Sequence, residues 1–344
     1  MIKSNSRYQQ STAPVRPSQR RQVLKATTLS VAWPLLGVTG RASAQGAWPS
    51  KPIRMIVGYT PGGFTDNMAR AVGEPLSKVL GQQVVFDYKP GANSQIGVDM
   101  MVKSAPDGYT LTTVIAAHSA NPSLYPKMPF DAQTDVAPVA LTGIGPLILV
   151  AHPSFPPKTI AELVAYVKTR PNQFNFGSSG KGAAAHLAME AFMFQHGLKM
   201  QHVPYKGTQP ALTDLIGGQI QLLFDVPLAM FQHVKAGKIK SLGMASEKRL
   251  PGYPEINTFA EGGVPFIANT WSMVLAPAKT PKDIVNRLNS EINKILASST
   301  VREKLESTGV QPGSGSPEDA AAFLASEVLR NAKVIKDAGV QLDN

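Results

Sequence analysis

Two glycine-rich turns constrain this chain most strongly, because each follows a strand-like run and opens a predicted helix. The first is the segment 60–66, Thr-Pro-Gly-Gly-Phe-Thr-Asp, and the second is the segment 177–182, Gly-Ser-Ser-Gly-Lys-Gly. Glycine lets backbone N–H groups approach a ligand closely, and the unpaired N–H groups in the first turn of a helix favour an anion. Two such turns that face each other predict a clamp for a small acid.

The sequence around the first turn alternates strand and helix patterns. Short apolar runs predict strands, and a 3.6-residue apolar period predicts helices. The predicted elements are strands at 53–59, 84–88 and 111–116 and helices at 66–80 and 96–104. This order predicts a parallel α/β domain. Gly73 and Pro75 lie inside the first helix and are expected to kink or divide it.

A second α/β series follows, and the chain then ends in helices. The predicted elements are strands at 147–150, 174–176, 222–224 and 241–245, helices at 160–168, 184–196 and 210–216, a strand at 271–276 and helices that begin at Pro281 and Pro317. Thr159 and Glu162 have the spacing of a capping box. The dipeptides Thr280-Pro281 and Ser316-Pro317 each supply a cap and a proline at the first helical position. With 344 residues, the chain is long enough for about two domains.

The positive charge of the chain is concentrated at its front. There are 34 basic and 23 acidic side chains, for a formal charge of +11, and residues 1–44 hold seven of the basic side chains and no acidic one. Without that segment the balance is 34 − 7 = 27 basic against 23 acidic side chains, or +4. The remaining basic residues do not cluster, so we expect no nucleic-acid partner.

Residues 1–44 show the three regions of an export signal. A basic region ends in Gln-Arg-Arg-Gln-Val-Leu-Lys at 19–25, an apolar stretch follows, and Ala42-Ser43-Ala44 forms a small-residue cleavage site. The apolar stretch is shorter than the about 20 residues that a membrane span needs. Arg20-Arg21 resembles the twin-arginine pattern, with the general secretory route as the alternative. We therefore expect cleavage between Ala44 and Gln45 and a periplasmic mature protein.

Several short motifs occur in a fixed order between about residue 48 and residue 340. They are Pro52-Ile53-Arg54-Met55-Ile56-Val57, Pro61-Gly62-Gly63-x-Thr65-Asp66-x-x-Ala69-Arg70, Leu80-Gly81-Gln82, Lys89-Pro90-Gly91-Ala92, Ala105-Pro106-Asp107-Gly108-Tyr109-Thr110-Leu111, Val203-Pro204-Tyr205-Lys206-Gly207, and Trp271 with Ala276-Pro277 and Thr280-Pro281. A lone Pro-Gly-Gly carries no information, but the ordered set is specific. In this set the chain resembles the receptor family of tripartite tricarboxylate transporters, also called Bug solute-binding proteins.

The resemblance implies the type II periplasmic-binding-protein fold, in which two α/β lobes are joined by crossover segments and the ligand cleft lies between them. We expect residues 48–146 and 270–344 to form the first lobe and residues 147–269 to form the second. The two glycine turns then come from different lobes. This agrees with the general rule that open α/β sheets bind ligands at the carboxyl ends of their strands.

The resemblance also assigns ligand contacts position by position in the first lobe. The ligand loop of the family corresponds to Tyr59, Thr60, Pro61, Gly62, Gly63, Phe64, Thr65 and Asp66. The backbone donors of this loop are expected to hold one carboxylate, together with ordered water. Thr65 and Asp66 are either ligand contacts or helix caps, and Phe64 either walls the pocket or packs under the loop. Later in this lobe, His118, Ser119 and Asn121 follow a strand end and are weaker candidates.

In the second lobe the family's other ligand loop corresponds to Ser178, Ser179, Gly180, Gly182 and His186. The two serines offer hydroxyl donors, the glycines allow close approach, and the histidine has either a pocket-lining or a structural role.

Four more positions of the second lobe are candidate ligand contacts. Tyr205, Lys206 and Asp225 complete the family pattern. Lys206 is either a cation for the ligand or a structural ion-pair partner of Asp225. Lys181 stands where the family has a small or apolar residue, and it either neutralises a ligand carboxylate or is solvated.

The sequence departs from the family at two further places. Asp87-Tyr88 stands where the family usually has Glu-Asn, and Asn93-Ser94 stands where it favours a further glycine. Both departures are expected to reshape the mouth of the pocket, so the identity of the ligand cannot be transferred from the family.

Competing functions are less well supported by the residues. The segment Gly177-x-Ser179-x-Lys181 does not complete the GxSxG pattern of a hydrolase, and HExxH and GxxxxGK[ST] motifs are missing from the sequence. We therefore expect no catalytic residues, metal or cofactor, and a monomer that delivers a small carboxylate to a membrane permease. A receptor that presents its closed form to a membrane sensor kinase is the alternative.

Overall fold

The computed structural model describes residues 48–340, so the predicted export signal lies outside the described residues. The first sheet has the strand order β11-β4-β10-β3-β1-β2. Strand β1 (Ile53–Val57) pairs in parallel with β2 (Val84–Tyr88) on one side and with β3 (Thr110–Ile115) on the other. These three strands are the ones that the apolar runs predicted in this part of the chain.

The three strands predicted to be parallel are parallel, and later strands make the first sheet mixed. Strand β10 (Asn269–Pro277) runs antiparallel to both β3 and β4 (Val136–Pro146), and β11 (Gln311–Pro312) runs antiparallel to β4. Strand β4 was not predicted at all, because its sequence contains two prolines and two glycines that interrupt the apolar pattern. The chain leaves the first sheet at the end of β4 and returns to it through β10, so these two strands run in opposite directions.

Six helices surround this sheet in the described part of the chain. They are α1 (Phe64–Leu80), α2 (Gln95–Val102), α3 (Ala117–Leu124), α8 (Lys282–Ala297), α9 (Ser299–Glu306) and α10 (Pro317–Ala338). Helix α1 was expected to be kinked or divided by Gly73 and Pro75, and it is not divided, because it runs as one helix through both. A Cβ on Gly73 would come within 2.8 Å of the Phe86 ring, so this glycine allows the helix to pack closely on β2.

The second sheet has the strand order β7-β6-β8-β5-β9. Its strands are β5 (Ile148–Ala151), β6 (Asn175–Ser178), β7 (Gln201–Pro204), β8 (Leu222–Asp225) and β9 (Lys240–Met244). Its helices are α4 (Ile160–Lys168), α5 (Ala184–His196), α6 (Thr208–Ile216) and α7 (Pro227–Lys235). Strand β6 is parallel to β7 and β8, so the carboxyl ends of all three strands meet at one edge. The Thr159 side chain accepts a hydrogen bond from the Glu162 N–H, as predicted.

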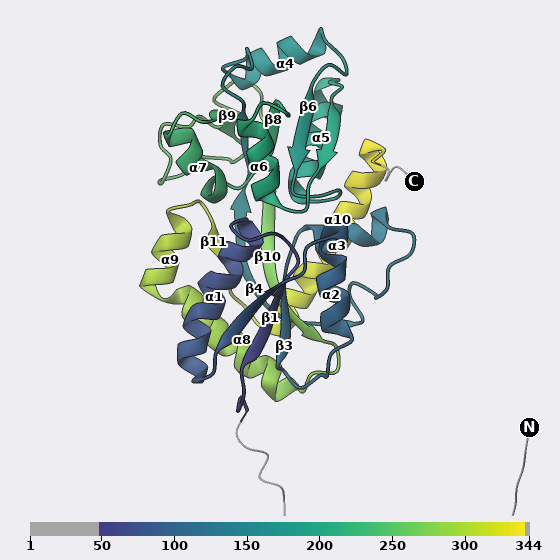
Figure 1. Cartoon of the computed structure of the whole chain (residues 1–344), viewed down its shortest axis with the longest axis vertical. Helices are drawn as coiled ribbons and strands as arrows, with labels where there is room; N and C mark the ends of the chain where they lie inside the picture. Colours follow the sequence, from purple (N-terminus) through teal and green to yellow (C-terminus); the bar gives the residue numbers. More distant parts are fainter. Residues whose placement is uncertain (1–47, 341–344) are drawn as a thin grey trace, which may run out of the picture. The chain divides into compact units, whose positions relative to one another are not determined.

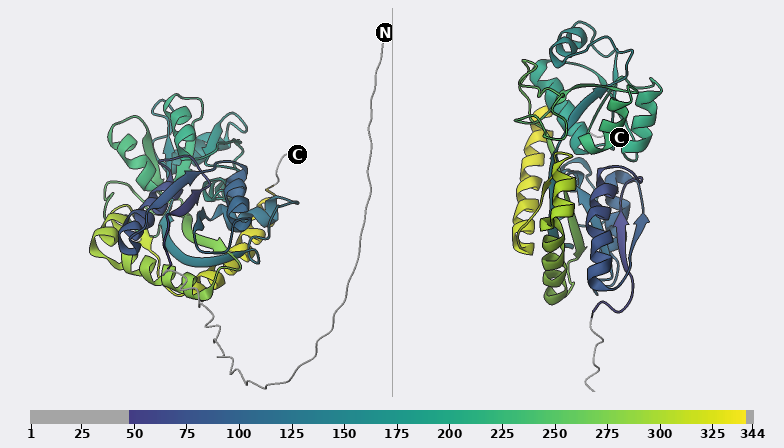
Figure 2. Two further views of the ribbon diagram at one scale, coloured as in Figure 1. Left: turned by 60° about the horizontal axis from the view of Figure 1, so that its bottom comes forward. Right: turned by 90° about the vertical axis from the view of Figure 1, so that its left-hand side faces the viewer.

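The two sheets are the centres of two α/β lobes that short segments join (Figure 1). At one crossover the Leu147 N–H donates to the Ala268 carbonyl at 3.0 Å, and the Ala268 N–H donates to the Ala245 carbonyl at 3.0 Å. Helix α10 begins in a Ser316–Asp319 capping box and packs on α3 and α5, so it contacts both lobes (Figure 2). The predicted residue boundaries of the lobes stay a prediction.

None of the helices between residues 48 and 340 is both long and apolar enough to cross a membrane.

Candidate ligand cleft

Three helices begin at the facing edges of the two sheets, and no side chain caps any of them. Helix α1 follows β1 after Gly63, α5 follows β6 after Ala183, and α6 follows β7 after Gly207. These small residues precede first turns whose N–H groups lack an intrahelical partner. The first turns of α1, α5 and α6 all contribute residues to one cavity. The unpaired N–H groups of these three first turns favour an anion at this cavity.

Two cavities lie next to each other between the lobes. The small cavity has a volume of about 20 Å³ and is lined by Tyr59, Gly63, Phe64, Thr65, Ile115, Leu147, Ser179, Ala184, Ala185, Thr208, Asp225 and Thr270. The large cavity has a volume of about 200 Å³ and is lined by Tyr59, Gly91, Ala92, Asn93, Ser94, Tyr125, Ser179, Gly180, Lys181, Pro204, Tyr205 and Lys206. Tyr59 and Ser179 belong to both linings. These two residues therefore stand where the two cavities adjoin.

The structure brings about half of the predicted ligand residues to these cavities. Those that line a cavity are Tyr59, Gly63, Phe64, Thr65, Ser179, Gly180, Tyr205, Lys206 and Asp225. Those that line neither are Thr60, Pro61, Gly62, Asp66, His118, Ser119, Ser178, Gly182 and His186. Both glycine turns contribute residues to both groups.

Asp225 is the buried carboxylate of the small cavity. Its Oδ2 accepts a hydrogen bond from the Thr208 hydroxyl at 2.7 Å, and its Oδ1 accepts one from the Val226 N–H at 2.7 Å. Burial raises the pKa of Asp225 to about 6, although both hydrogen bonds lower it. The partners of Asp225 are therefore Thr208 and Val226 rather than Lys206, whose side chain is exposed.

Thr270 supplies a buried hydroxyl to the small cavity. It lies at the start of β10 and is 3% exposed, and its Oγ1 has no hydrogen-bond partner among residues 48–340. A buried hydroxyl without a partner is costly, because it has lost its hydrogen bonds to water. A ligand oxygen or a water in the small cavity would satisfy it.

The loops of the two lobes touch in this structure. The Thr60 N–H donates to the Lys206 carbonyl at 3.3 Å, and the Gln209 side-chain amide donates to the Gly62 carbonyl at 3.1 Å. Gly207 lies so close that a Cβ on it would be 2.3 Å from Thr60 Oγ1. Only a glycine allows this approach, so this contact between the two loops depends on it.

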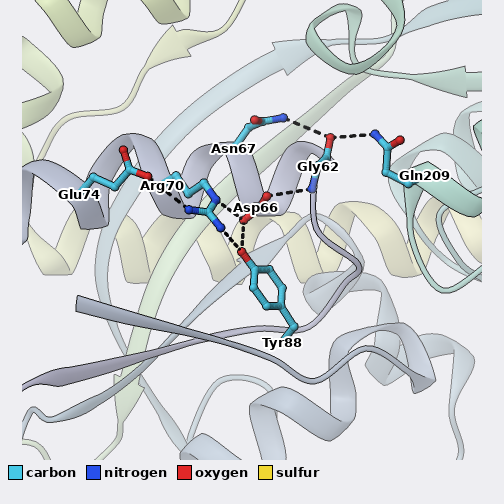
Figure 3. A network of polar contacts seen from close by, with 7 residues as sticks. All are labelled: Gly62, Asp66, Asn67, Arg70, Glu74, Tyr88 and Gln209. Atoms are coloured by element: carbon cyan, nitrogen blue, oxygen red, sulfur yellow. Dashed lines mark hydrogen bonds and ion pairs between the residues drawn. The ribbon is translucent and has the colours of Figure 1, made fainter. Parts of the chain in front are cut away.

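Asp66 holds the first glycine turn in place (Figure 3). Its Oδ2 accepts a hydrogen bond from the Gly62 N–H at 2.8 Å, and its Oδ1 accepts bonds from the Tyr88 hydroxyl at 2.6 Å and from Arg70 at 3.0 Å. The Gly62 N–H therefore points to Asp66, which makes Asp66 an anchor of the turn. Tyr88, one of the departures from the family pattern, completes this network.

The second glycine turn is supported from beneath by stacked rings. Ser178 is fully buried, and its hydroxyl contacts the Gly180 carbonyl at 2.9 Å and His202 Nε2 at 2.7 Å. The ring centroids of His186 and His202 are 3.8 Å apart, and His186 Nδ1 accepts a hydrogen bond from the Gly182 N–H at 3.0 Å. Burial, with His186 and Lys181 nearby, lowers the pKa of His202 to about 2. Such a histidine is a weak base, and the Ser178 hydroxyl is held by the Gly180 carbonyl and His202.

His118 and Ser119 lie inside the first lobe. His118 Nε2 pairs with the Ala132 carbonyl at 2.8 Å, and burial lowers the pKa of His118 to about 4. The Ser119 hydroxyl donates to the Ala116 carbonyl and accepts from Asn331 on α10. These contacts give both residues a structural role in the described part of the chain.

Several residues of the cleft were not predicted from the sequence. Thr208 follows Gly207 and opens a helix, which is the same signal that identified the two other turns. Asn93 and Ser94 were expected to reshape the mouth of the pocket but were not predicted to contact the ligand, and they line the large cavity. Thr270 and Leu147 come from the crossover segments, which local sequence patterns do not place.

Within residues 48–340, no group of three or more His, Cys, Asp or Glu side chains is arranged to hold a metal ion.

Comparison with known proteins defines the class of this fold. The chain is similar to the periplasmic binding protein BugD, with 33% sequence identity and a TM-score of 0.81 over 86% of this chain and 99% of that one. It is also similar to the R. palustris protein Rpa4515 solved with adipate, with 35% identity and a TM-score of 0.83 over 86% and 99% of the two chains. The fold is therefore the type II periplasmic-binding-protein fold, as predicted.

Residues 68–340 match the model of the tripartite tricarboxylate transporter family receptor. The chain is also 36% identical to Protein BugT of Bordetella pertussis over 309 residues, which cover 89% of this chain and 94% of that protein. The chain belongs to this receptor family, which confirms the resemblance that the ordered motifs indicated. MatC from Rhodopseudomonas palustris, solved with bound malate, shares 29% identity and a TM-score of 0.78 over 83% of this chain and 99% of that one.

Proposed function

We propose that this protein is a periplasmic receptor that captures a small carboxylate between its lobes and delivers it to the membrane permease of a tripartite transporter. One observation carries the carboxylate part of the proposal: three uncapped helix N-termini contribute to a cavity that also contains the unpartnered hydroxyl of Thr270. Relatives solved with adipate and with malate support the same class of ligand. The permease partner is proposed from family membership.

The helix N-termini supply only part of the binding free energy. A helix N-terminus contributes about 0.3 to 2 kcal/mol to binding an anion, so three contribute about 1 to 6 kcal/mol. Micromolar affinity needs about 8 kcal/mol. The remainder would come from direct hydrogen bonds and from burial of the ligand when the lobes close. The contacts between Thr60 and Lys206 and between Gln209 and Gly62 form part of that closed state.

A screen with matched neutral compounds tests the ligand class. The purified protein is heated with malate, with adipate and with the diamides of the same acids, and the melting temperature is measured. A bound ligand raises the melting temperature by mass action. We expect an increase with at least one acid and none with its diamide. Equal effects of an acid and its diamide would show that the cleft does not recognise carboxylates.

The Thr270 hydroxyl provides a sharper test, since it makes no hydrogen bond among residues 48–340. Thr270→Val keeps the shape of the side chain and is expected to leave the stability of the ligand-free protein unchanged or higher. We expect it to weaken the binding of the acid by about 0.5 to 1.5 kcal/mol, about twofold to tenfold, the value of one hydrogen bond. Thr142→Val is the matched control, because Thr142 is equally buried and unpartnered but lines neither cavity. Unchanged affinity of Thr270→Val would remove Thr270 from the site.

We also propose that the protein returns its ligand unchanged. The buried Ser178 and the low pKa of His202 support this. NMR of an acid recovered after hours with the protein is expected to show the starting compound alone. A product whose formation stops in a Ser178→Ala or Ser179→Ala variant would make the protein an enzyme instead.

A further inference from the structure

A turn beside the large cavity has positive φ angles at four successive residues. The angles are 136° at Gly91, 44° at Ala92, 51° at Asn93 and 71° at Ser94. In the described part of the chain, the other non-glycine residue with positive φ is Asn172. Non-glycine residues adopt this conformation rarely, and it persists where surrounding contacts fix it.

The side chain of Asn93 supplies contacts that fix this turn. Its Oδ1 accepts a hydrogen bond from the Tyr59 hydroxyl at 2.8 Å, and its Nδ2 donates to Asn121 Oδ1 at 2.7 Å. The Asn121 amide in turn donates to the Asn93 carbonyl at 3.2 Å. Asn93 is 8% exposed, so its amide is bonded and buried at the edge of a cavity.

The same amide lies against the glycine turn of the second lobe. A Cβ on Gly180 would be 3.0 Å from Asn93 Oδ1, and a Cβ on Gly182 would be 3.3 Å from Asn93 Nδ2. The two turns therefore pack on each other through Asn93. If the lobes separate, Asn93 keeps its bonds to Tyr59 and Asn121 and loses this contact.

Tyr59 connects Asn93 to the ligand cleft. Tyr59 lines both cavities, and its hydroxyl donates a hydrogen bond to Asn93. Asn93 thus fixes the orientation of a ring that stands where the two cavities meet. A diacid with one carboxylate in the small cavity would extend past this ring into the large cavity.

We propose that Asn93 is a positioning residue that fixes Tyr59 between the two cavities, supports the second-lobe turn in the closed form, and thereby sets the length of acid that the cleft accepts. This inference rests on the proposed function and adds a determinant of specificity to it. Removing the Asn93 side chain frees the Tyr59 ring and enlarges the large cavity. The effect on binding should therefore depend on the length of the acid.

The test compares two Asn→Gly substitutions at positive φ. Asn93→Gly removes the amide of the cleft, and Asn172→Gly makes the same change at an exposed position outside it. Calorimetry with malate and with adipate gives the dissociation constants. We expect Asn93→Gly to weaken malate binding about fivefold or more, the value of a lost hydrogen bond, and adipate binding by less. We expect Asn172→Gly to change neither. Equal losses for both acids, or no loss, would overturn the proposal.

A double-mutant cycle shows whether Asn93 acts through Tyr59. In a Tyr59→Phe background, Asn93→Gly is expected to cause little further change in the ratio of the two affinities. Additive changes would mean that Asn93 has only a structural role and would overturn the proposal.

If the wild-type protein binds no acid, the proposed function fails and the proposal is tested without a ligand. Hydrogen exchange at residues 178–182 would then be expected to be faster in Asn93→Gly than in Asn172→Gly, and equal exchange would overturn the proposal.

Discussion

The buried carboxylate of Asp225 should make the stability of the protein depend on pH in a defined window. Asp225→Asn is the suitable perturbation, because asparagine keeps an oxygen for the Val226 N–H and its amide can donate to the Thr208 hydroxyl. The substitution therefore replaces an ionisable group by a neutral one of the same shape. It mimics protonated Asp225 at every pH.

The expected size follows from the shift of the pKa. Burial raises the pKa of Asp225 from 3.8 to about 6. One pKa unit corresponds to about 1.4 kcal/mol, so the shift corresponds to about 3 kcal/mol. Because the pKa of Asp225 is higher in the folded than in the unfolded state, its contribution to the free energy of unfolding is fully present below the unfolded-state pKa. This contribution is lost as the pH rises through the folded-state pKa. The loss therefore occurs between about pH 4 and pH 6.

The assay is urea unfolding of the wild type and of Asp225→Asn, without ligand, at several pH values from 4 to 7.5. Other carboxylates titrate in both proteins, so the difference between the two free energies of unfolding isolates Asp225. We expect the wild type to lose about 3 kcal/mol relative to the variant over this range. A difference that stays constant with pH would refute the assignment of a raised pKa to Asp225.

Three further outcomes are expected. Gly207→Ala should weaken acid binding at least about tenfold by blocking closure of the lobes. Gly197→Ala, where φ is also positive but a Cβ would meet no atom within 4 Å, should leave the affinity unchanged. Calorimetry that finds equal affinities for the two variants would contradict this. Glu327→Leu should lower the free energy of unfolding by about 1 to 3 kcal/mol, because it leaves the Trp271 indole N–H unpaired, and Glu327→Gln should cost less; urea unfolding measures both. The exported protein should begin at Gln45, which intact mass spectrometry would show.

The sequence predicted the parts of the fold that local patterns encode. Strands β1, β2 and β3, the caps of α4 and α10, and the two glycine turns all follow from residues close to one another in the chain. Strand β4 could not be recognised, because its prolines and glycines break the apolar pattern and its pairing partners lie more than a hundred residues away. Its place in the sheet is decided by tertiary contacts.

In the cleft, too, local sequence patterns identify some residues and tertiary contacts alone place the others. The glycine turns were found because glycine before a helix has a local meaning, but whether each side chain faces the cavity depends on its partners. Asp66 and His186 turn to the backbone of their own loops, at Gly62 and Gly182. Thr270 could not be found, because only the return of the chain from the second lobe brings it to the small cavity.

A crystal structure of the protein with a bound diacid tests the central claim most directly. The account predicts one carboxylate in the small cavity, within hydrogen-bond distance of N–H groups in the first turns of α1 and α5 and of the Thr270 hydroxyl. It also predicts that the rest of the acid passes between Tyr59 and Ser179 into the large cavity. An acid bound elsewhere, or a carboxylate in the small cavity without contact to a helix N-terminus, would contradict the account.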